Sequence, residues 1–391
     1  MTAGPVETGI ERIRIRNYRV LGDVELDGLT PVTALVGPNG SGKSTVFDAL
    51  GLVAEALGGG LEAAWSRRDG LSEIRSRELA GPVEIEVACR REGALFEYVV
   101  VLDEDDDGPV AVRERLSWSP GDPESLIGVL DFGRGVGRVR RPGEQGWRDE
   151  ELASARILAA GVFGQLLGNA HLGQFLGLMG RVQLIDLDVS AMRSGTRGVR
   201  RGTGLDPRGD NIAMRVETLR DEHAGEWAEV LRALRRYVPG LEDILPLRLG
   251  DGSHIVRLKE KGSAEPILPE NISDGTMLLL GYLVALRSPL AVLLLEEPEN
   301  QVHPRLHYLL AEDARGGAAD QVIAATHSPR FVDALRPDEV WAFAKADDGY
   351  AEVKRASDEA PVARMAEAGA ALGELWTEGY FRFGDPLVER P

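Results

Sequence analysis

Hydrophobic and polar residues alternate with two different periods along this chain of 391 residues. Near the start, ERIRIRNY (11–18) and VLGDVEL (20–26) place apolar residues between charged ones, which predicts two strands with one buried and one solvated face. The fully apolar run PVTALV (31–36) predicts a buried strand. A glycine-rich turn follows, and the apolar spacing after it predicts a helix from about Lys43 to Leu57.

The middle of the chain predicts a β part followed by a helical part. Strands are expected at 83–90, 94–102 and 110–118. The acidic stretch DEDDDG (103–108) is interpreted as a solvated hairpin tip, with a metal site as the alternative. The stretches that are rich in Gly, Arg or Pro predict irregular segments at 58–80 and 119–150. Helices are expected at 151–180 and 209–238, with a strand at 182–189 between them.

Short strands and helices alternate from residue 241 onward, which favours a parallel sheet with crossover helices. The helix SDGTMLLLGYLVALR (273–287) precedes two apolar strands, AVLLLEE (291–297) and QVIAATHS (321–328). The apolar stretch from Gly275 to Leu295 approaches membrane-spanning length. Because Arg287 and Pro289 interrupt it, we interpret it as a buried helix followed by a buried strand.

Composition sets limits on what the chain can do. Hydrophobic residues make up 43% and charged residues 28%, as in soluble globular proteins, and the formal net charge is −18. Contact with nucleic acid therefore needs a local basic patch. The single cysteine, Cys89, excludes an internal disulfide. The N-terminus lacks the apolar core of a signal peptide, so we expect a cytoplasmic protein without a membrane segment.

The strongest chemical signal is GPNGSGKST (37–45), which matches the phosphate-loop pattern G-x-x-x-x-G-K-[ST] between an apolar strand and a helix. Its glycines let successive backbone N–H groups face phosphate oxygens, and the following helix adds the positive end of its dipole. Lys43 places a charge on the outer phosphates, and the Ser44 hydroxyl can bind Mg²⁺. The expected nucleotide-binding residues are Gly37, Pro38, Asn39, Gly40, Ser41, Gly42, Lys43, Ser44 and Thr45.

Three further motifs follow in the second half of the chain. AVLLLEEPEN (291–300) ends an apolar strand in acids, which suits Glu296 to the Mg²⁺ shell and Glu297 to polarising the attacking water. ATHSP (325–329) ends another strand, where His327 could hydrogen-bond a γ-phosphate. In ISDGTMLLL (272–280), Ser273 and Gly275 open a helix whose N-terminus attracts anions, although Ser273 alone is simply an N-cap.

Together, these motifs resemble the ABC-type ATPase heads of the SMC, RecF and OLD group, and more closely the short RecF/OLD-like AAA ATPases without a nuclease domain. The resemblance covers residues 11–57 and about 205–345. It implies an α/β phosphate-loop fold of the ABC-ATPase type, with a mixed sheet, an antiparallel N-terminal β part and a helical insert. We expect core halves at 1–58 and 206–391 around an insert at 59–205.

The resemblance also implies a mechanism. Mg²⁺-dependent ATP hydrolysis would use Lys43, Glu297 and His327, with Ser44 and Glu296 at the metal. Ser273 and Gly275 would serve ATP that is held by a second subunit, and residues 299–303 would cross the dimer interface. The implied setting is DNA repair or phage defence, with a separately encoded effector as a possible partner.

Two residues depart from the family pattern. Glu296 stands where the first acid is usually aspartate, and Asp274 stands where transporter ATPases have glycine in S-G-G. Asp274 would bring a negative charge near a γ-phosphate, or point away from it. The glutamine that commonly contacts Mg²⁺ is not identifiable among Gln145, Gln165, Gln174 and Gln183.

Several alternatives stay open. Two Arg-rich runs could bind double-stranded DNA or simply be solvated loops: Arg134, Arg138, Arg140, Arg141 and Arg148 in one, and Arg193, Arg197, Arg200, Arg201 and Arg208 in the other. A transporter subunit is disfavoured because about 230 residues separate the phosphate loop from Ser273. An OLD-type nuclease is disfavoured because no acidic cluster follows the last core strand, and Asp186–Asp188 is interpreted as structural. A nucleotide switch with little turnover is the remaining rival.

Overall fold

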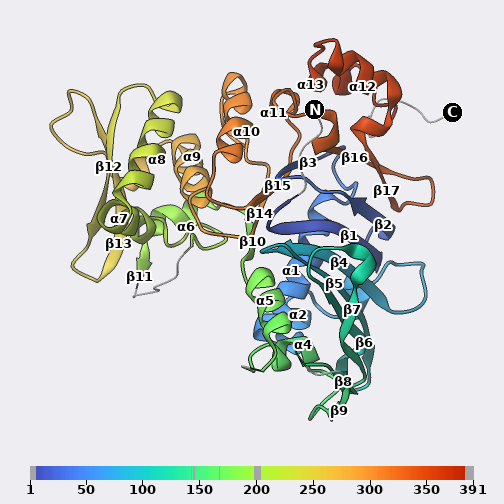
Figure 1. The fold of residues 1–391 in the computed structure, drawn as a ribbon. Helices are drawn as coiled ribbons and strands as arrows, with labels where there is room; N and C mark the ends of the chain where they lie inside the picture. The colour runs from blue at the N-terminus through green and yellow to red at the C-terminus, as the bar shows by residue number, and fades with distance from the viewer. Residues whose placement is uncertain (1–5, 142, 144–145, 167, 198–203, 384–391) are drawn as a thin grey trace.

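The computed structural model describes residues 6–141, 143, 146–166, 168–197 and 204–383, and these form three sheets with helices packed around them (Figure 1). A six-stranded sheet lies at the centre. An eight-stranded antiparallel sheet extends from one side of it and a lobe with a three-stranded sheet from another. The predicted α/β fold with a mixed sheet and an antiparallel N-terminal β part is confirmed.

The central sheet has the strand order β10-β14-β15-β3-β16-β17. Its members are β10 (Val182–Ile185), β14 (Val292–Glu296), β15 (Gln321–Ala325), β3 (Val32–Val36), β16 (Val340–Lys345) and β17 (Ala351–Arg355). The first five run parallel and β17 is antiparallel. Every residue of β3 and β15 is buried, which explains why both read as continuous apolar runs.

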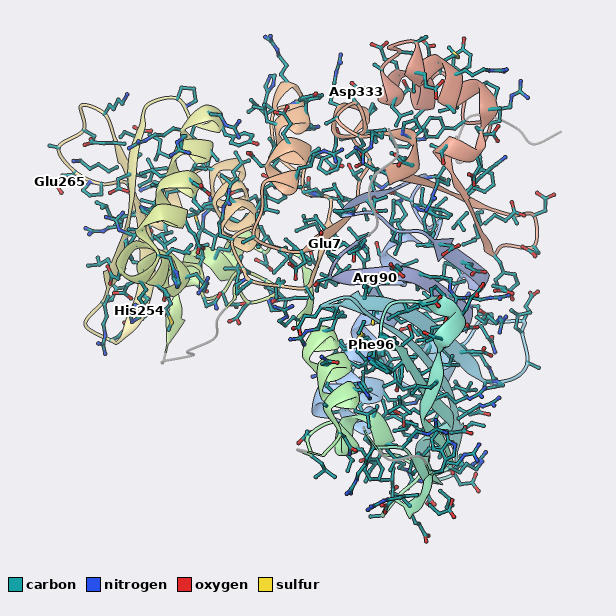
Figure 2. All side chains as sticks on the ribbon, in the orientation of Figure 1. Glu7, Arg90, Phe96, His254, Glu265 and Asp333 are labelled. Carbon is teal, nitrogen blue, oxygen red and sulfur yellow. The ribbon has the colours of Figure 1, made fainter. Side chains whose placement is uncertain are left out.

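The eight-stranded sheet has the order β2-β1-β4-β5-β6-β7-β8-β9. Its strands are β1 (Gly9–Tyr18), β2 (Leu21–Asp27), β4 (Val83–Arg91), β5 (Ala94–Asp105), β6 (Gly108–Ser119), β7 (Ile127–Gly133), β8 (Val136–Val139) and β9 (Arg148–Glu151). The apolar side chains of this sheet share a core with α1 (Lys43–Gly59), α4 (Ala159–Phe163) and α5 (Ala170–Met179). Phe96 of β5, which is labelled in Figure 2, is buried in this core. The centroid of its ring lies 6.2 Å from that of Phe175.

The prediction of irregular structure is wrong for two segments. Residues 119–150 contain β7, β8 and most of β9, and residues 58–80 contain α2 (Leu61–Ser66) and α3 (Leu71–Ile74). The three strands extend the sheet edge through backbone pairing, and several of their side chains are exposed, so no strong apolar alternation marks them. The hairpin tip at 103–108 is confirmed, and no metal-binding group of three or more His, Cys, Asp or Glu occurs in the described part of the chain.

The lobe beside β10 contains β11 (Thr196–Arg197), β12 (Leu241–Arg248) and β13 (Ser253–Glu260), packed with α6 (Val189–Ser194), α7 (Ile212–Glu222), α8 (Ala224–Tyr237) and α9 (Asp274–Ala285). The expected helix at 209–238 is two helices that meet at His223. The expected helix at 151–180 is reduced to α4 and α5. The expected strand at 182–189 ends at Ile185, and α6 begins four residues later.

The remaining elements of the described residues are four helices in the last hundred residues and five short turns along the chain. They are α10 (His307–Arg315), α11 (Pro329–Val332), α12 (Ala360–Glu367) and α13 (Leu372–Thr377), with 3-10 turns at Pro123–Ser125, Pro269–Asn271, Pro304–Leu306, Pro337–Glu339 and Ala356–Asp358. The apolar stretch Gly275–Leu295 divides into α9 and β14, as predicted. Across the described ranges, no helix combines the length and the apolar character that a membrane span requires.

Candidate functional site: a phosphate loop facing two acidic strand ends

The carboxyl ends of three parallel strands meet at one edge of the central sheet. Glu296 of β14 is paired with Ala325 of β15, which is paired in turn with Leu35 of β3. The residues that follow each strand therefore come together. A cavity of about 170 Å³ is lined by the phosphate loop and by Glu296, Glu297 and His327.

Two glycines of the phosphate loop are required by its geometry. Gly37 has φ 141°, and a Cβ there would lie 2.3 Å from the carbonyl oxygen of Phe343. Gly42 has φ 107°, and its Cβ would lie 2.8 Å from Leu21 Cδ2. The loop is thus pressed against β16 on one side and β2 on the other, and no larger residue fits. α1 starts at the next residue, Lys43, so its N-terminus faces the cavity.

Lys43 is buried, with 6% of its surface exposed, and its Nζ donates to the carbonyl oxygens of Gly37 (2.9 Å) and Pro38 (3.0 Å). Burial lowers the pKa of Lys43 to about 8, against the opposing attraction of the carboxylates of Glu297, Glu296 and Glu299. The ammonium group is therefore held at the loop by weak neutral acceptors. A phosphate is a much stronger partner for it.

The donor set for Mg²⁺ consists of the Ser44 hydroxyl and the Glu296 carboxylate, which line the same cavity. Glu296 Oε1 is buried and has no hydrogen-bond partner among the described residues. An orphaned buried carboxylate oxygen beside a hydroxyl suits a hard cation that takes its other ligands from water and phosphate. The residues present fit the metal.

Glu297 has a left-handed backbone, with φ 42°, while its N–H donates to the carbonyl oxygen of Ala325 at 2.9 Å. This conformation is uncommon outside glycine and turns the chain out of the strand. The carboxylate is half exposed and lies 3.9 Å from His327 Nε2. Burial lowers the pKa of His327, and the nearby Lys43 charge lowers it further, so the ring favours its neutral form.

Two hydrogen-bonded connections hold the loop after β14 against the loop after β15. Glu299 Oε1 accepts from Thr326 Oγ1 (2.8 Å) and from the N–H of His327 (2.7 Å). His307 bridges Ser328 Oγ (2.7 Å) and the carbonyl oxygen of Val302 (2.8 Å). Sequence reasoning assigned no catalytic or positioning role to Glu299 or His307. The signal for Glu299 was its place within EEPENQVHP (296–304), beside the acidic strand end, whereas His307 lies three residues beyond that motif, at the start of α10.

Ser273 and Gly275 do not line the phosphate-loop cavity. They lie at the start of α9, where Ser273 Oγ caps the helix by accepting from the N–H of Thr276 at 3.2 Å. A Cβ on Gly275 would lie 2.6 Å from the carbonyl oxygen of Gln301, so α9 packs closely against the loop after β14. The side chain of Asp274 pairs with Arg193, with Nη2 and Oδ1 2.5 Å apart.

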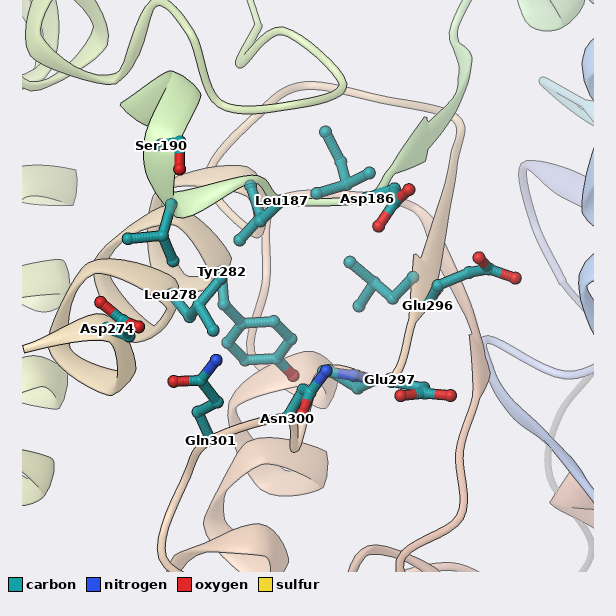
Figure 3. A pocket seen from close by; sticks show the side chains of 14 residues that line it. Asp186, Leu187, Ser190, Asp274, Leu278, Tyr282, Glu296, Glu297, Asn300 and Gln301 are labelled. Atoms are coloured by element: carbon teal, nitrogen blue, oxygen red, sulfur yellow. The ribbon is translucent and has the colours of Figure 1, made fainter. Parts of the chain in front are cut away.

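An acidic pocket of about 440 Å³ separates α9 from the strand ends. Figure 3 shows Asp274 and Ser190 on one side of it and Asp186 and Glu296 on the other. Asp186, which the sequence analysis interpreted as structural within the insert, follows β10 at the edge of the central sheet. Four acidic residues thus line this pocket: Asp186, Asp274, Glu296 and Glu297.

The other predicted side chains lie elsewhere. Gln165 donates to the carbonyl oxygen of Gly161, Gln183 donates to that of Leu205, and Gln174 lies in α5, so none of these three lines the phosphate-loop cavity. Gln145, Arg200 and Arg201 lie outside the described residues. Arg208 pairs with Asp188, while Arg138 pairs with Asp131 and, like Arg140, stacks on Trp147.

A further cavity, of about 660 Å³, adjoins the phosphate-loop cavity, since Val20 lines both of them. Its lining includes Arg19, Arg75, Lys345 and Tyr350. The smaller cavity has room for phosphates but not for a whole nucleoside triphosphate. The larger one extends the site past the turn between β1 and β2.

Comparison with known proteins gives one family match. The profile of the family described as "AAA domain, putative AbiEii toxin, Type IV TA system" matches residues 32–162 and 188–333, which is most of the chain. Among curated proteins, the OLD nuclease of Thermus scotoductus is 48% identical over 44 residues. That alignment covers 11% of this chain and only 8% of the relative's length.

Among solved structures, an Smc head domain with an extended coiled coil, bound to the C-terminal domain of ScpA derived from Pyrococcus furiosus, aligns with a TM-score of 0.51. It is 14% identical, and the alignment covers 93% of this chain and all of that one. An SmcHead bound to the C-winged helix domain of ScpA aligns over 88% of this chain and 97% of its own, with 13% identity and a TM-score of 0.49. At 14% identity, the alignment with the Smc head domain that carries the extended coiled coil shows the fold alone.

Proposed function

Because the chain belongs to this AAA-domain family, we propose that it is an ATP hydrolase of the ABC type that dimerises when ATP binds. One observation carries the proposal: the phosphate loop, Glu296, Glu297 and His327 line a single cavity. Residues separated by more than 250 positions supply its two sides. The short stretch of identity to an OLD nuclease and the Smc-head fold support an ATPase head, and they assign no nuclease activity.

ATP binding begins with the exchange of partners at Lys43. Its ammonium group leaves the carbonyl oxygens of Gly37 and Pro38 and binds the β- and γ-phosphates, while the N–H groups of the loop and of α1 bind the same anion. Ser44 and Glu296 would hold Mg²⁺, which supplies positive charge to the phosphate oxygens. The nucleoside extends past Val20 into the larger cavity.

Hydrolysis then depends on Glu297 and His327. The half-exposed carboxylate of Glu297 accepts a hydrogen bond from the attacking water and orients it toward the γ-phosphate. The neutral ring of His327 contacts the same water or the phosphate. Glu299 fixes the backbone of His327, so the two groups keep their separation.

Dimerisation completes the site. Among the described residues that line the cavity, the only helix N-terminus is that of α1. We propose that the N-terminus of α9, with Ser273 and Gly275, closes on the ATP of a second copy. Loss of the γ-phosphate then removes the contacts that join the two copies.

The test is Glu297→Gln, measured by sizing and by phosphate release with Mg·ATP. The variant keeps the shape of the side chain but accepts the water proton poorly, so a stable ATP-dependent dimer with turnover reduced at least a hundredfold is expected. Glu367→Gln, on the exposed face of α12, is the matched control and should behave as the parent. A monomer in every nucleotide state would overturn the dimer. ATP-dependent dimerisation with no measurable turnover in the parent would favour the nucleotide switch.

A nucleic-acid partner is a separate part of the proposal. Arg134, Arg140 and Arg148 lie on or beside the strands β7 to β9, and none of the three lines the phosphate-loop cavity. Binding of double-stranded DNA there should fall steeply with salt, because counterions are released from the phosphates. Turnover with and without DNA, at two salt concentrations, separates this partner from a protein effector.

A further inference from the structure

We propose that Arg193 is a positioning residue that neutralises Asp274 and thereby lets the N-terminus of α9 accept the γ-phosphate held by a second copy. The inference rests on the proposed function and adds to it a role for the ion pair between Arg193 and Asp274 at the N-terminus of α9. Arg193 belongs to α6 and lies about eighty positions before the residues it contacts.

Arg193 holds the entry to α9 at three points. Its Nε donates to the carbonyl oxygen of Pro269 at 3.1 Å. Its Nη2 lies 2.5 Å from the carbonyl oxygen of Ile272 and 2.5 Å from Asp274 Oδ1. These acceptors stand on both sides of Ser273, so one guanidinium group fixes the backbone before the helix and the first side chain within it.

The charges around α9 explain why this contact matters. The acidic pocket is lined by four acidic residues and by no lysine or arginine among the described residues. A γ-phosphate approaching α9 would therefore meet a strongly negative field, which opposes the attraction of the helix N-terminus. Arg193 reaches Asp274 from α6 and cancels the carboxylate that lies closest to the helix N–H groups. An aspartate at position 274, where transporter ATPases have glycine, is then compatible with binding of a phosphate at the N-terminus of α9.

Arg193 also joins two parts of the site. α6 follows the segment of Asp186, which lines the acidic pocket beside Glu296. Val189 and Ser190 of α6 line the same pocket. The guanidinium group therefore links α6, whose first residues line the pocket together with Glu296, to the first residue of α9.

The experiment is a double-mutant test in the Glu297→Gln background, with ATP-dependent dimerisation measured by sizing or light scattering. Arg193→Ala should weaken the dimer at least tenfold while leaving ATP binding by the monomer within twofold. Asp274→Gly should then restore dimerisation to Arg193→Ala, because the uncompensated carboxylate is gone. Arg208→Ala, which removes a nearby exposed ion pair with Asp188, is the control and should change neither quantity.

The outcomes separate three explanations. If Arg193 only ties down the backbone at Pro269 and Ile272, Asp274→Gly will not restore the dimer, and the inference is wrong. Wild-type dimerisation of Arg193→Ala also overturns it. If the Glu297→Gln parent itself stays monomeric with ATP, the proposed function fails before Arg193 is tested.

Mixing two inactive variants tests whether Arg193 acts across the interface. Arg193→Ala keeps an intact phosphate loop, and Lys43→Ala keeps an intact α9 surface. A mixed dimer then contains one complete site of two, so an equimolar mixture should show turnover above that of either variant alone. No recovery would mean that Arg193 serves its own chain's nucleotide, which contradicts the proposal.

Discussion

A single carboxylate oxygen, Glu299 Oε1, accepts both the backbone N–H of His327 at 2.7 Å and the hydroxyl of Thr326 at 2.8 Å. Glu299 is 9% exposed and stands two residues after Glu297. The loop that carries the candidate general base therefore also holds the candidate sensor of the γ-phosphate. A displacement of one loop must move the other.

Glu299→Ala should reduce turnover more than it reduces ATP binding. The substitution leaves two donors without their acceptor, which costs about 1–3 kcal/mol in the free energy of unfolding, and it releases His327 from its position opposite Glu297. Glu299→Gln keeps one oxygen acceptor and should retain most of both properties. Denaturant unfolding and steady-state hydrolysis measure the two effects. Equal losses in ATP affinity and turnover would contradict a positioning role.

ATP affinity should fall as the pH rises above 8. In the nucleotide-free protein, the pKa of Lys43 is lowered to about 8 by burial, so the ammonium form that binds phosphate is depleted at higher pH. Between pH 7 and pH 9.5 the affinity for a non-hydrolysable ATP analogue should drop about thirtyfold, with proton uptake on binding, as linkage requires. Calorimetry in buffers of different ionisation enthalpy measures both quantities. Lys43→Arg keeps its charge throughout this range and should show a flat profile.

Gly275→Ala should disturb the junction between α9 and the loop after β14. The new Cβ would stand 2.6 Å from the carbonyl oxygen of Gln301, so one of the two backbones must shift, at a cost of about 1–3 kcal/mol. ATP-dependent dimerisation should weaken with it. Gly225→Ala, in the first turn of α8, has nothing within 4 Å of the added carbon and should be neutral or slightly stabilising. Thermal unfolding and sizing of both variants test the contrast.

The stability of the protein should contain a pH-dependent contribution from Glu114. This carboxylate is 1% exposed, and it accepts from Tyr98 Oη (2.9 Å) and from the N–H groups of Ala159 (2.6 Å) and Ala160 (3.0 Å). Burial raises its pKa from 4.5 to about 7, against the lowering effect of these hydrogen bonds.

Because the folded-state pKa is the higher one, the contribution of Glu114 is complete below pH 4.5 and is lost as the pH rises to about 7. The free energy of unfolding should therefore fall by ~3 kcal/mol across this window relative to Glu114→Gln, which cannot ionise. Urea titrations at pH 4.5, 6 and 7.5 provide the measurement. Parallel curves for the parent and the glutamine variant would show that Glu114 does not titrate there.

The sequence predicted the elements whose side chains alternate or run apolar, and it missed those built mainly by backbone pairing. β3, β14 and β15 are short, buried apolar runs, and the phosphate loop, the acidic pair and His327 follow them. The sequence therefore predicted both the strands and the edge of the sheet where these residues come together. β8 and β9 have few buried side chains and were expected to be loop. Backbone hydrogen bonds to an existing edge leave no periodic signal in the residues that make them.

The same limit applies to the site. Motif spacing indicated the phosphate loop, Glu297 and His327, because each follows an apolar strand. It could not indicate that Arg193 reaches Asp274, since that contact joins α6 to α9 across about eighty residues. The position of Asp186 beside Glu296 was likewise hidden, because β10 joins the central sheet from a stretch that was expected to belong to the insert.

The position of β3 between β15 and β16 has a consequence for synthesis of the protein. The five buried residues of β3 leave the ribosome almost 300 residues before β15, the first of its two neighbours to be synthesised. At about 5–20 residues per second, a nascent strand with both edges unpaired waits on the order of 15–60 seconds for its sheet. Such a strand is a hazard for aggregation, so expression at low temperature or with a chaperone that shields extended apolar segments should raise the yield of native protein.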